Sequence, residues 1–326
     1  MSRFLADCHL HFEGCLPEET VRALAARTGH RFADPAVFEL ARSQVRGAAG
    51  FLDLYAEVCR LFRRPDDYFE AARAVAARFD RDGLAYAEVY VSPEIFSVLG
   101  LPAAECLAAV AAGLEEGQTG GTRSRILLDA VRHWGPESAH RVLDLYERRP
   151  LPAIVGFGLG GDESSYPASA FAGAYLRARS LGLRTSVHAG EWAGAESVAD
   201  ALDALRPDRI DHGIAAAGDP RLMARLADEG TVLCVAPSSN RATGAVEDLA
   251  LHPLRRMLSA GVRVALAADD PVLFGTTTRR EYDVARDALG LSPGQRRHCA
   301  ENSWRAAFCA ETERSAGLAA LAGAEI

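Results

Sequence analysis

Residues 184–213, RTSVHAGEWAGAESVADALDALRPDRIDHG, place two short β-rich runs on either side of a segment with helical periodicity. The runs cover 184–188 and 208–212, and the helical segment covers 194–205. A strand, a helix and a second strand in this order predict a βαβ unit with parallel strands. Ionisable groups stand where both runs stop, because the first ends in His188 and the second in His212.

The same alternation recurs about eight times along the chain. The other strand candidates are 4–9, 85–91, 125–131, 153–157, 231–236 and 262–267, and the other helical segments are 102–115, 136–148, 167–181, 219–229 and 276–290. Eight such units predict a (β/α)8 TIM barrel. The sequence contains no internal repeat and no linker rich in Pro, Ser or Gly, so we expect residues 1–326 to form a single domain.

One gap between predicted strands is much longer than the others and spans roughly 16–84. It holds helical pieces at 17–28, 49–63 and 66–80. The second piece has an apolar face with the spacing of a helix, formed by Phe51, Leu54, Tyr55, Val58, Leu61 and Phe62. This face packs against the barrel wall, covers the barrel mouth as a lid, or does both, because insertions after a barrel strand lie on the catalytic face.

At the other end of the chain, Ser292 and Pro293 form a helix start, with an N-cap followed by proline at the first helical position. We expect this helix to run to about Cys309. The last segment, 311–326, is rich in alanine and is expected to close the bottom of the barrel or to fray.

The composition restricts the partners. The chain has 326 residues, 49% of them hydrophobic, and a formal charge of −8. A net-acidic surface gains nothing from contact with a phosphate backbone, so nucleic acid is not expected as a partner. No apolar stretch reaches the ~18 residues of a membrane span.

The seven cysteines are odd in number, widely spaced and without a C-x-x-C pair. This pattern is typical of reduced thiols in the cytoplasm. The first residues run directly into a strand-like segment, and we expect no signal peptide.

Four motifs carry candidate chemistry, and each stands at the end of an apolar run. They are His9-Leu10-His11, His188-Ala-Gly-Glu191, Asp211-His212-Gly213 and Asp269-Asp270-Pro271. Residues i and i+2 of a strand share a face, so His9 and His11 project together into the barrel. With a third imidazole from His188 and a carboxylate from Asp269, the set suits one divalent metal ion.

Each motif alone also fits a structural explanation. A strand-end histidine is often satisfied by a backbone partner, and an Asp-Asp-Pro triplet is often a solvated turn. The four motifs in order, each following apolar residues, favour a metal site, because a buried charge is costly without a partner or a metal.

The ligand types select the ion. Three imidazoles and one carboxylate without a thiolate suit Zn²⁺ and also accept Fe²⁺, Co²⁺ or Mn²⁺. The sequence contains no lysine, which excludes Schiff-base chemistry and the carboxylated lysine that bridges two metals in many binuclear barrel hydrolases. One ion is therefore expected. His212 and Glu191 remain as spare groups for moving protons.

These residues resemble the adenosine deaminase-like branch of the metal-dependent amidohydrolases, including its bacterial members that act on adenosine, adenine or 6-aminodeoxyfutalosine. The matching segments cover nearly the whole chain. They are Cys8–Gly14, Tyr86–Val89 with Ser92-Pro93, Gly156–Glu163, His188–Glu191, Arg209–Gly213, Pro237–Asn240, Asp269–Pro271 with Phe274, and Asn302-Ser303 with Phe308.

The resemblance implies a role for each group. His9, His11, His188 and Asp269 would bind the metal. Glu191 would protonate purine N1, and His212 would orient the attacking hydroxide. Asp270 would hydrogen-bond N7, the backbone N–H of Gly161 would meet N3, and His11 and Glu13 would also contact the substrate. Attack at C6 would then expel ammonia and leave a 6-oxopurine.

Departures from the family pattern concern the substrate side. Glu13 stands where an Asp commonly meets the ribose 5′-hydroxyl, Gly158 where animal-type enzymes have Asp, and Tyr90 where many members have Arg. Ala236 stands before Pro237 where the family usually has Cys. A site built around a substrate hydroxyl strongly rejects analogues without it, so single polar changes redirect specificity.

The leading hypothesis is a zinc-dependent deaminase of a 6-aminopurine nucleoside, either adenosine or a 5′-modified adenosine. The alternatives are a deaminase of adenine or of 6-aminodeoxyfutalosine, and a mononuclear amidohydrolase that acts on a non-purine amidine. A different class, a catalytically silent relative that binds nucleosides or a partner, predicts a damaged catalytic set, and here Glu191, His212 and Asp270 are all present. The oligomeric state stays open.

Overall fold

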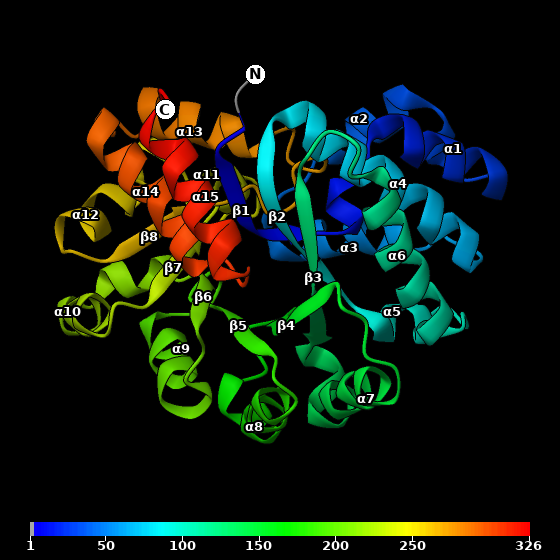
Figure 1. Ribbon diagram of the computed structural model, residues 1–326, viewed down its shortest axis with the longest axis horizontal. Coiled ribbons are helices and arrows are strands. Elements are labelled where there is room, and N and C mark those ends of the chain that lie inside the picture. The colour runs from blue at the N-terminus through cyan, green and yellow to red at the C-terminus, as the bar shows by residue number, and fades with distance from the viewer. Residues whose placement is uncertain (1–2) are drawn as a thin grey trace.

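The computed structural model describes residues 3–326 and contains eight parallel strands around a central axis, with helices outside them (Figure 1). The strands pair in chain order from β1 to β8. They are β1 (Leu5–His11), β2 (Leu84–Val91), β3 (Arg123–Val131), β4 (Ile154–Gly160), β5 (Arg184–Ala189), β6 (Arg209–His212), β7 (Val232–Val235) and β8 (Arg263–Leu266). All eight predicted strands are present, and the predicted TIM barrel is confirmed.

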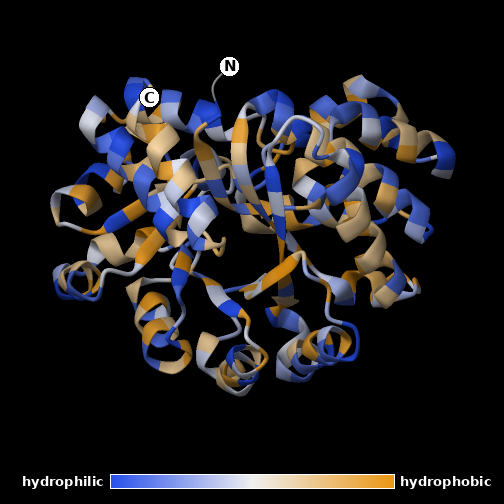
Figure 2. Cartoon of the chain, in the orientation of Figure 1, coloured by the Kyte–Doolittle hydropathy of each residue, from blue (hydrophilic) through white to orange (hydrophobic). Residues whose placement is uncertain are grey.

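The barrel is nearly closed between its first and last strands. Backbone hydrogen bonds join Asp269 N to His9 O and His11 N to Asp269 O, each at 3.0 Å, just after the end of β8. Both faces of the strands are buried because helices cover their outer faces. Figure 2 shows strands with orange segments and also blue ones, which agrees with the polar residues buried inside the barrel. This closure brings the carboxyl ends of β1 and β8 together, where the active sites of such barrels lie.

Fifteen α-helices are present in residues 3–326, and none of them is long and apolar enough to cross a membrane. They are α1 (Glu18–Thr28), α2 (Pro35–Ser43), α3 (Gly47–Cys59), α4 (Pro65–Asp82), α5 (Pro93–Val98), α6 (Ala103–Gly117), α7 (Gly135–Arg148), α8 (Ala172–Ser180), α9 (Ala195–Asp200), α10 (Pro220–Glu229), α11 (Pro237–Ala242), α12 (Leu254–Ser259), α13 (Thr278–Asp287), α14 (Pro293–Ala306) and α15 (Glu311–Ala322). The predicted helical segments all contain a helix, but α2, α5, α11 and α12 were not predicted. Three of these four begin with a proline and none exceeds nine residues, so they offer little periodic signal.

The insertion between β1 and β2 folds into α1, α2, α3 and α4 on one side of the barrel, beside β1 and β2 (Figure 1). Both expectations for α3 hold. Leu54 and Val58 are buried in the hydrophobic core, while Phe51 and Tyr55 line the cavity at the barrel mouth. The helix therefore packs on the wall with one part of its face and covers the mouth with another.

The C-terminal segment is helical rather than frayed. Ser292 caps α14 through a capping box with Gln295, as the sequence predicted, and α14 packs against β1 and β8. Helix α15 packs on α14 where Gly317 meets the indole ring of Trp304, which leaves no room for a side chain.

Candidate metal centre and active site

Four ligand atoms from three parts of the chain meet at the barrel mouth. The Nε2 atoms of His9, His11 and His188 lie 3.0–3.2 Å from one another. Asp269 Oδ1 lies 3.3 Å from Nε2 of His9 and 3.4 Å from Nε2 of His11. Nitrogens bound to one zinc ion at about 2.0–2.1 Å stand about 3 to 3.4 Å apart. The arrangement therefore fits a single ion, and it unites the four residues predicted as ligands.

Two of the groups at this site need an unusual backbone conformation. His212 and Asp269 have φ values of 63° and 61°, in the left-handed region that non-glycine residues seldom adopt. His212 is the last residue of β6 and Asp269 follows β8 by three residues, so this conformation directs both side chains into the barrel mouth. Such strain persists where the surrounding structure enforces it, and it clusters at functional sites.

The imidazole rings are oriented by groups behind them. His188 Nδ1 lies 3.2 Å from the carbonyl oxygen of Leu159, to which it donates, so its Nε2 carries the lone pair. The carboxylate of Asp211 lies 3.8 Å from His9 Nδ1 and 3.7 Å from His188 Nδ1. It is held in place by the hydroxyls of Tyr90 at 2.5 Å and Ser186 at 2.8 Å. Partners of this kind orient metal ligands and raise their basicity.

The electrostatics of the cluster also suit a cation. Burial lowers the pKa of His11 to about 3 and that of His188 to about 4, so both are neutral and able to bind a metal. Burial opposes a charge on His9 as well, but the carboxylates of Asp211 and Asp269 raise its pKa to about 9. A divalent cation held by Nε2 of His9 and by Asp269 would replace a proton there and would balance the charge of the carboxylates.

The predicted acid and base lie beside the ligands. Glu191 Oε2 is 3.3 Å from His212 Nε2, and Thr243 donates to Glu191 Oε1 at 3.2 Å. Burial and the nearby Asp269 raise the pKa of Glu191 well above its ordinary value. Asn240 lies 3.1 Å from His212 Nδ1. This arrangement keeps a protonated carboxyl group and a neutral imidazole at the same end of the cavity.

Asp270 is 1% exposed and packs tightly on Gly14, where an added methyl group would lie 1.8 Å from Asp270 Oδ1. Within residues 3–326 that oxygen has no hydrogen-bond partner. Burial and Asp269 raise the pKa of Asp270 well above its ordinary value, so the group is poised to donate a hydrogen bond. Gly161, with φ at 91°, also lines the cavity.

Glu13 occupies a different place from the one expected. Its side chain is 1% exposed and accepts a 2.6 Å hydrogen bond from the hydroxyl of Tyr55 on α3. Tyr55 lines the cavity, whereas Glu13 is not among the cavity-lining residues of the described chain. The tyrosine hydroxyl thus bonds Oε2 of the carboxylate to which the family resemblance gives a ribose contact, whereas Oε1 is buried without a partner in residues 3–326.

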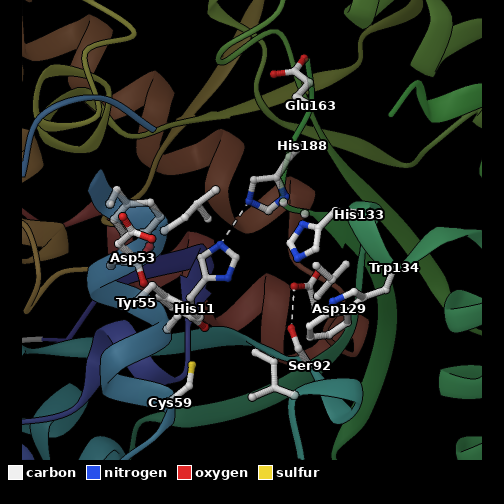
Figure 3. Close-up of a pocket in the computed structure, with 18 of the residues that line it drawn as sticks. His11, Asp53, Tyr55, Cys59, Ser92, Asp129, His133, Trp134, Glu163 and His188 are labelled. Atoms are coloured by element: carbon white, nitrogen blue, oxygen red, sulfur yellow. Dashed lines mark hydrogen bonds between the residues drawn. The ribbon is translucent and has the colours of Figure 1, made fainter. Parts of the chain in front are cut away.

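Glu163 is a functional residue that the sequence reasoning missed. Its carboxylate accepts hydrogen bonds from the backbone N–H groups of residues 190–193 and from the Ser197 hydroxyl. The Glu163 side chain, drawn above His188 in Figure 3, therefore holds the turn that carries Glu191. The residue stands within the Gly156–Glu163 motif, after the end of β4, which is the signal that could have identified it.

The cavity itself has a volume of about 290 Å³, at the small end for ligand sites. Its wall away from the metal ligands is formed by β2, β3, α3 and the segment after β3. The residues there include Phe51, Tyr55, Ser92, Asp129 and Trp134, and Trp192, which follows β5, also lines the cavity. Figure 3 shows Ser92 and Asp129 hydrogen-bonded to each other on this wall, at 2.8 Å. Apart from Phe51 and Tyr55, which the helical pattern pointed out, the sequence analysis assigned no cavity contact to these side chains.

Comparison with known proteins agrees with this geometry. The sequence profile of the adenosine deaminase family matches residues 5–322. An adenine deaminase from Sinorhizobium medicae is 39% identical over 322 residues, which cover 97% of each chain. The crystal structure of an adenine deaminase from Arthrobacter aurescens superposes with a TM-score of 0.93, at 31% identity and over 98% of each chain. An amidohydrolase from Burkholderia ambifaria with bound zinc has a TM-score of 0.87 and 26% identity, over 98% of this chain and 90% of its own.

Proposed function

Because the chain belongs to the adenosine deaminase family, we propose that it hydrolyses free adenine to hypoxanthine and ammonia. The family identifies the protein as a hydrolytic aminohydrolase. The family shows the class of reaction, and the choice of adenine as the substrate is our proposal. The single observation that carries it is the position of Tyr55, which lines the cavity and donates to Oε2 of Glu13 at 2.6 Å, while Glu13 itself is not among the cavity-lining residues of the described chain.

The choice of adenine reverses the order of the two hypotheses drawn from the sequence. A nucleoside deaminase needs an acceptor for ribose hydroxyls at the mouth, and Glu13 was the expected acceptor. Here that carboxylate is buried and already bonded to Tyr55. The small cavity and the relatives named adenine deaminase support the free base as well.

We propose that His9, His11, His188 and Asp269 hold one Zn²⁺ ion. The four converging ligand atoms and the zinc found in one structural relative support this assignment. The same ligands accept Fe²⁺, Co²⁺ or Mn²⁺. When bound, the ion supplies Lewis acidity that makes water nucleophilic near neutral pH.

The remaining groups act on the base. Glu191 donates a proton to ring nitrogen N1, which makes the neighbouring C6 electrophilic. His212, 3.3 Å from Glu191, orients the attacking water and accepts its proton. Asp270, buried and without a partner in the described chain, donates to N7, and the backbone N–H of Gly161 donates to N3. Water adds at C6, the proton taken up by His212 passes to the amino nitrogen, the C6–N6 bond breaks and ammonia leaves, and the proton of the new C6 hydroxyl returns to Glu191 to give the 6-oxopurine.

Two coarser features belong to the same proposal. The family profile spans 5–322, which supports a single catalytic domain over 1–326. The seven cysteines are free thiols, six of them buried, which supports a reducing compartment such as the cytoplasm.

The direct test is a spectrophotometric screen of the purified zinc-loaded protein. The substrates are adenine, adenosine, deoxyadenosine and 5′-modified adenosines that include 6-aminodeoxyfutalosine. We expect adenine to have the highest kcat/KM, with ammonia released in equal amount. A higher kcat/KM for a nucleoside would overturn the choice of substrate, and turnover of none of these purines would overturn the function.

A further inference from the structure

The carboxyl group of Asp129 is a buried polar group without a complete set of partners. Asp129 lies on β3, two residues before its end, and is 4% exposed. Its Oδ2 accepts the 2.8 Å hydrogen bond from Ser92, but its Oδ1 has no partner in residues 3–326. Both residues line the cavity. A buried acceptor without a donor is costly, and the cavity is the one direction from which a ligand can supply the donor.

The surroundings of Asp129 leave room for a flat ring edge. The neighbouring strand ends in Gly160, and a methyl group added there would lie 3.4–3.5 Å from the two carboxyl oxygens. Without that methyl group, the space beside the carboxyl group stays open. Gly161 follows at once, so a ring that meets the Gly161 N–H has its next edge near Asp129.

The order of the strands around the barrel indicates which edge this is. In the proposed orientation of adenine, Glu191 after β5 meets N1, Gly161 after β4 meets N3, and Asp270 after β8 meets N7. Around the purine ring the nitrogens follow in the order N1, N3, N9 and N7. Around the barrel the strands follow in the order β5, β4, β3, β2, β1 and β8. The nitrogen between N3 and N7 is N9, and the strand after β4 in this direction is β3.

We propose that Asp129, positioned by Ser92, accepts a hydrogen bond from the N9–H of the free purine base and thereby selects the base over its nucleosides. This inference rests on the proposed function. In free adenine with N7 accepting from Asp270, the imidazole proton resides on N9 and completes the partners of Asp129. In a nucleoside N9 carries the sugar and has no proton, so Asp129 stays buried without a donor.

The test compares adenine with 9-methyladenine, which lacks only the N9 proton and adds one methyl group. The enzymes are the unmodified protein, Asp129→Ala, and Asp144→Ala as a matched control on the outer helix α7, where Asp144 pairs with Arg177 at 2.7 Å. If an enzyme does not deaminate 9-methyladenine, we measure the inhibition constant of 9-methyladenine with adenine as the substrate and use it in place of kcat/KM.

We expect Asp129→Ala to lower kcat/KM for adenine by about 100-fold and to change the value for 9-methyladenine by less than about 3-fold. The ratio of kcat/KM for adenine to kcat/KM for 9-methyladenine therefore falls in Asp129→Ala, whereas Asp144→Ala leaves this ratio unchanged. Asp129→Asn preserves the side-chain volume and provides a second variant should Asp129→Ala not fold. Because the amide oxygen of Asp129→Asn is a neutral and weaker acceptor, we expect the ratio of the two kcat/KM values to fall by about 10-fold.

The outcomes separate the two proposals. Turnover of adenine with an unchanged preference in Asp129→Ala or, where that variant does not fold, in Asp129→Asn would overturn this inference and leave adenine deamination standing. Turnover of no 6-aminopurine by the unmodified protein would overturn the proposed function, and this inference with it.

Discussion

The mouth of the barrel has two halves that differ in how their polar groups are satisfied. The catalytic half is formed by the ends of β1, β5, β6 and β8, and the recognition half by the ends of β2, β3 and β4 together with α3 and with Glu13, which follows β1 and bonds to α3. In the catalytic half most polar side chains contact one another, as the three imidazoles and Asp269 do within 3.0–3.4 Å. In the recognition half Asp129 waits for a partner and Glu13 is covered by Tyr55.

The difference separates chemistry from specificity. A preorganised cluster of ligands, acid and base works on any substrate whose reacting carbon reaches it, because its geometry is set before the substrate arrives. We propose that the recognition half decides which molecules reach this cluster, because the unpaired Oδ1 of Asp129 and the aromatic wall would suit a flat base with an N–H group at that edge. Substitutions in the two halves should therefore change different kinetic quantities.

The largest effect is expected from loss of a metal ligand. His9→Ala leaves only two imidazoles and the carboxylate of Asp269, so we expect bound zinc to fall below one ion per chain and kcat to drop by about 10³-fold or more. Metal analysis and turnover of adenine measure both. The control is His298→Ala on the outside of α14, where the imidazole is half exposed. Full activity of His9→Ala with no bound metal would show that the reaction does not need a metal ion held by these residues.

The next effect separates proton transfer from metal binding. Glu191→Gln keeps the size of the side chain and its contact with Thr243 but has no proton to donate to the ring. We expect kcat to fall by about 10² to 10⁴-fold, while the zinc content stays at one ion. Glu196→Gln, on the exposed start of α9, is the matched control. A variant that retained most of the activity would show that another group protonates the base.

A smaller effect is expected from the residue that holds the catalytic turn. Glu163→Gln replaces a carboxylate that accepts from four backbone N–H groups and one hydroxyl by an amide with one oxygen. The turn loses several charge-assisted hydrogen bonds, so we expect kcat to fall by about 10 to 100-fold while KM for adenine changes little. Metal analysis and thermal unfolding accompany the kinetics. Loss of zinc or a collapse of thermal stability instead would mean that Glu163 supports the fold rather than the position of Glu191.

The two halves also differ in how far the sequence predicted them. The pair of ligands on β1 was predictable because residues two apart in a strand point to the same face, as His9 and His11 do. The location of the site was predictable because four of the apolar runs are followed by ionisable residues, and parallel strands bring those ends together. The left-handed backbone of His212 and Asp269 was not predictable, since neither position is a glycine.

In the recognition half the decisive pairs join different elements. Ser92 and Asp129 are 37 residues apart, and Glu13 and Tyr55 are 42 apart. No local pattern links such residues, because their contact depends on how β2 lies beside β3 and how α3 folds over β1. The apolar face of α3 indicated a helix near the mouth but not that one hydroxyl on it would cover a carboxylate. For this reason the sequence favoured a nucleoside substrate, whereas the contact between Tyr55 and Glu13 supports the free base.

The smallest expected effect tests that placement in the recognition half. Tyr55→Phe removes the hydroxyl that donates to Glu13 and keeps the aromatic ring on the cavity wall. The freed carboxylate becomes available to a ribose hydroxyl, so we expect kcat/KM for adenosine to rise relative to adenine by about 3 to 10-fold, close to the energy of one hydrogen bond. Tyr146→Phe, on the outer helix α7, is the control, and kcat for adenine should stay within about 2-fold because the catalytic half is untouched. An unchanged ratio of the two substrates would mean that Glu13 takes no part in excluding the sugar, and that the exclusion comes from the shape of the cavity and from Asp129.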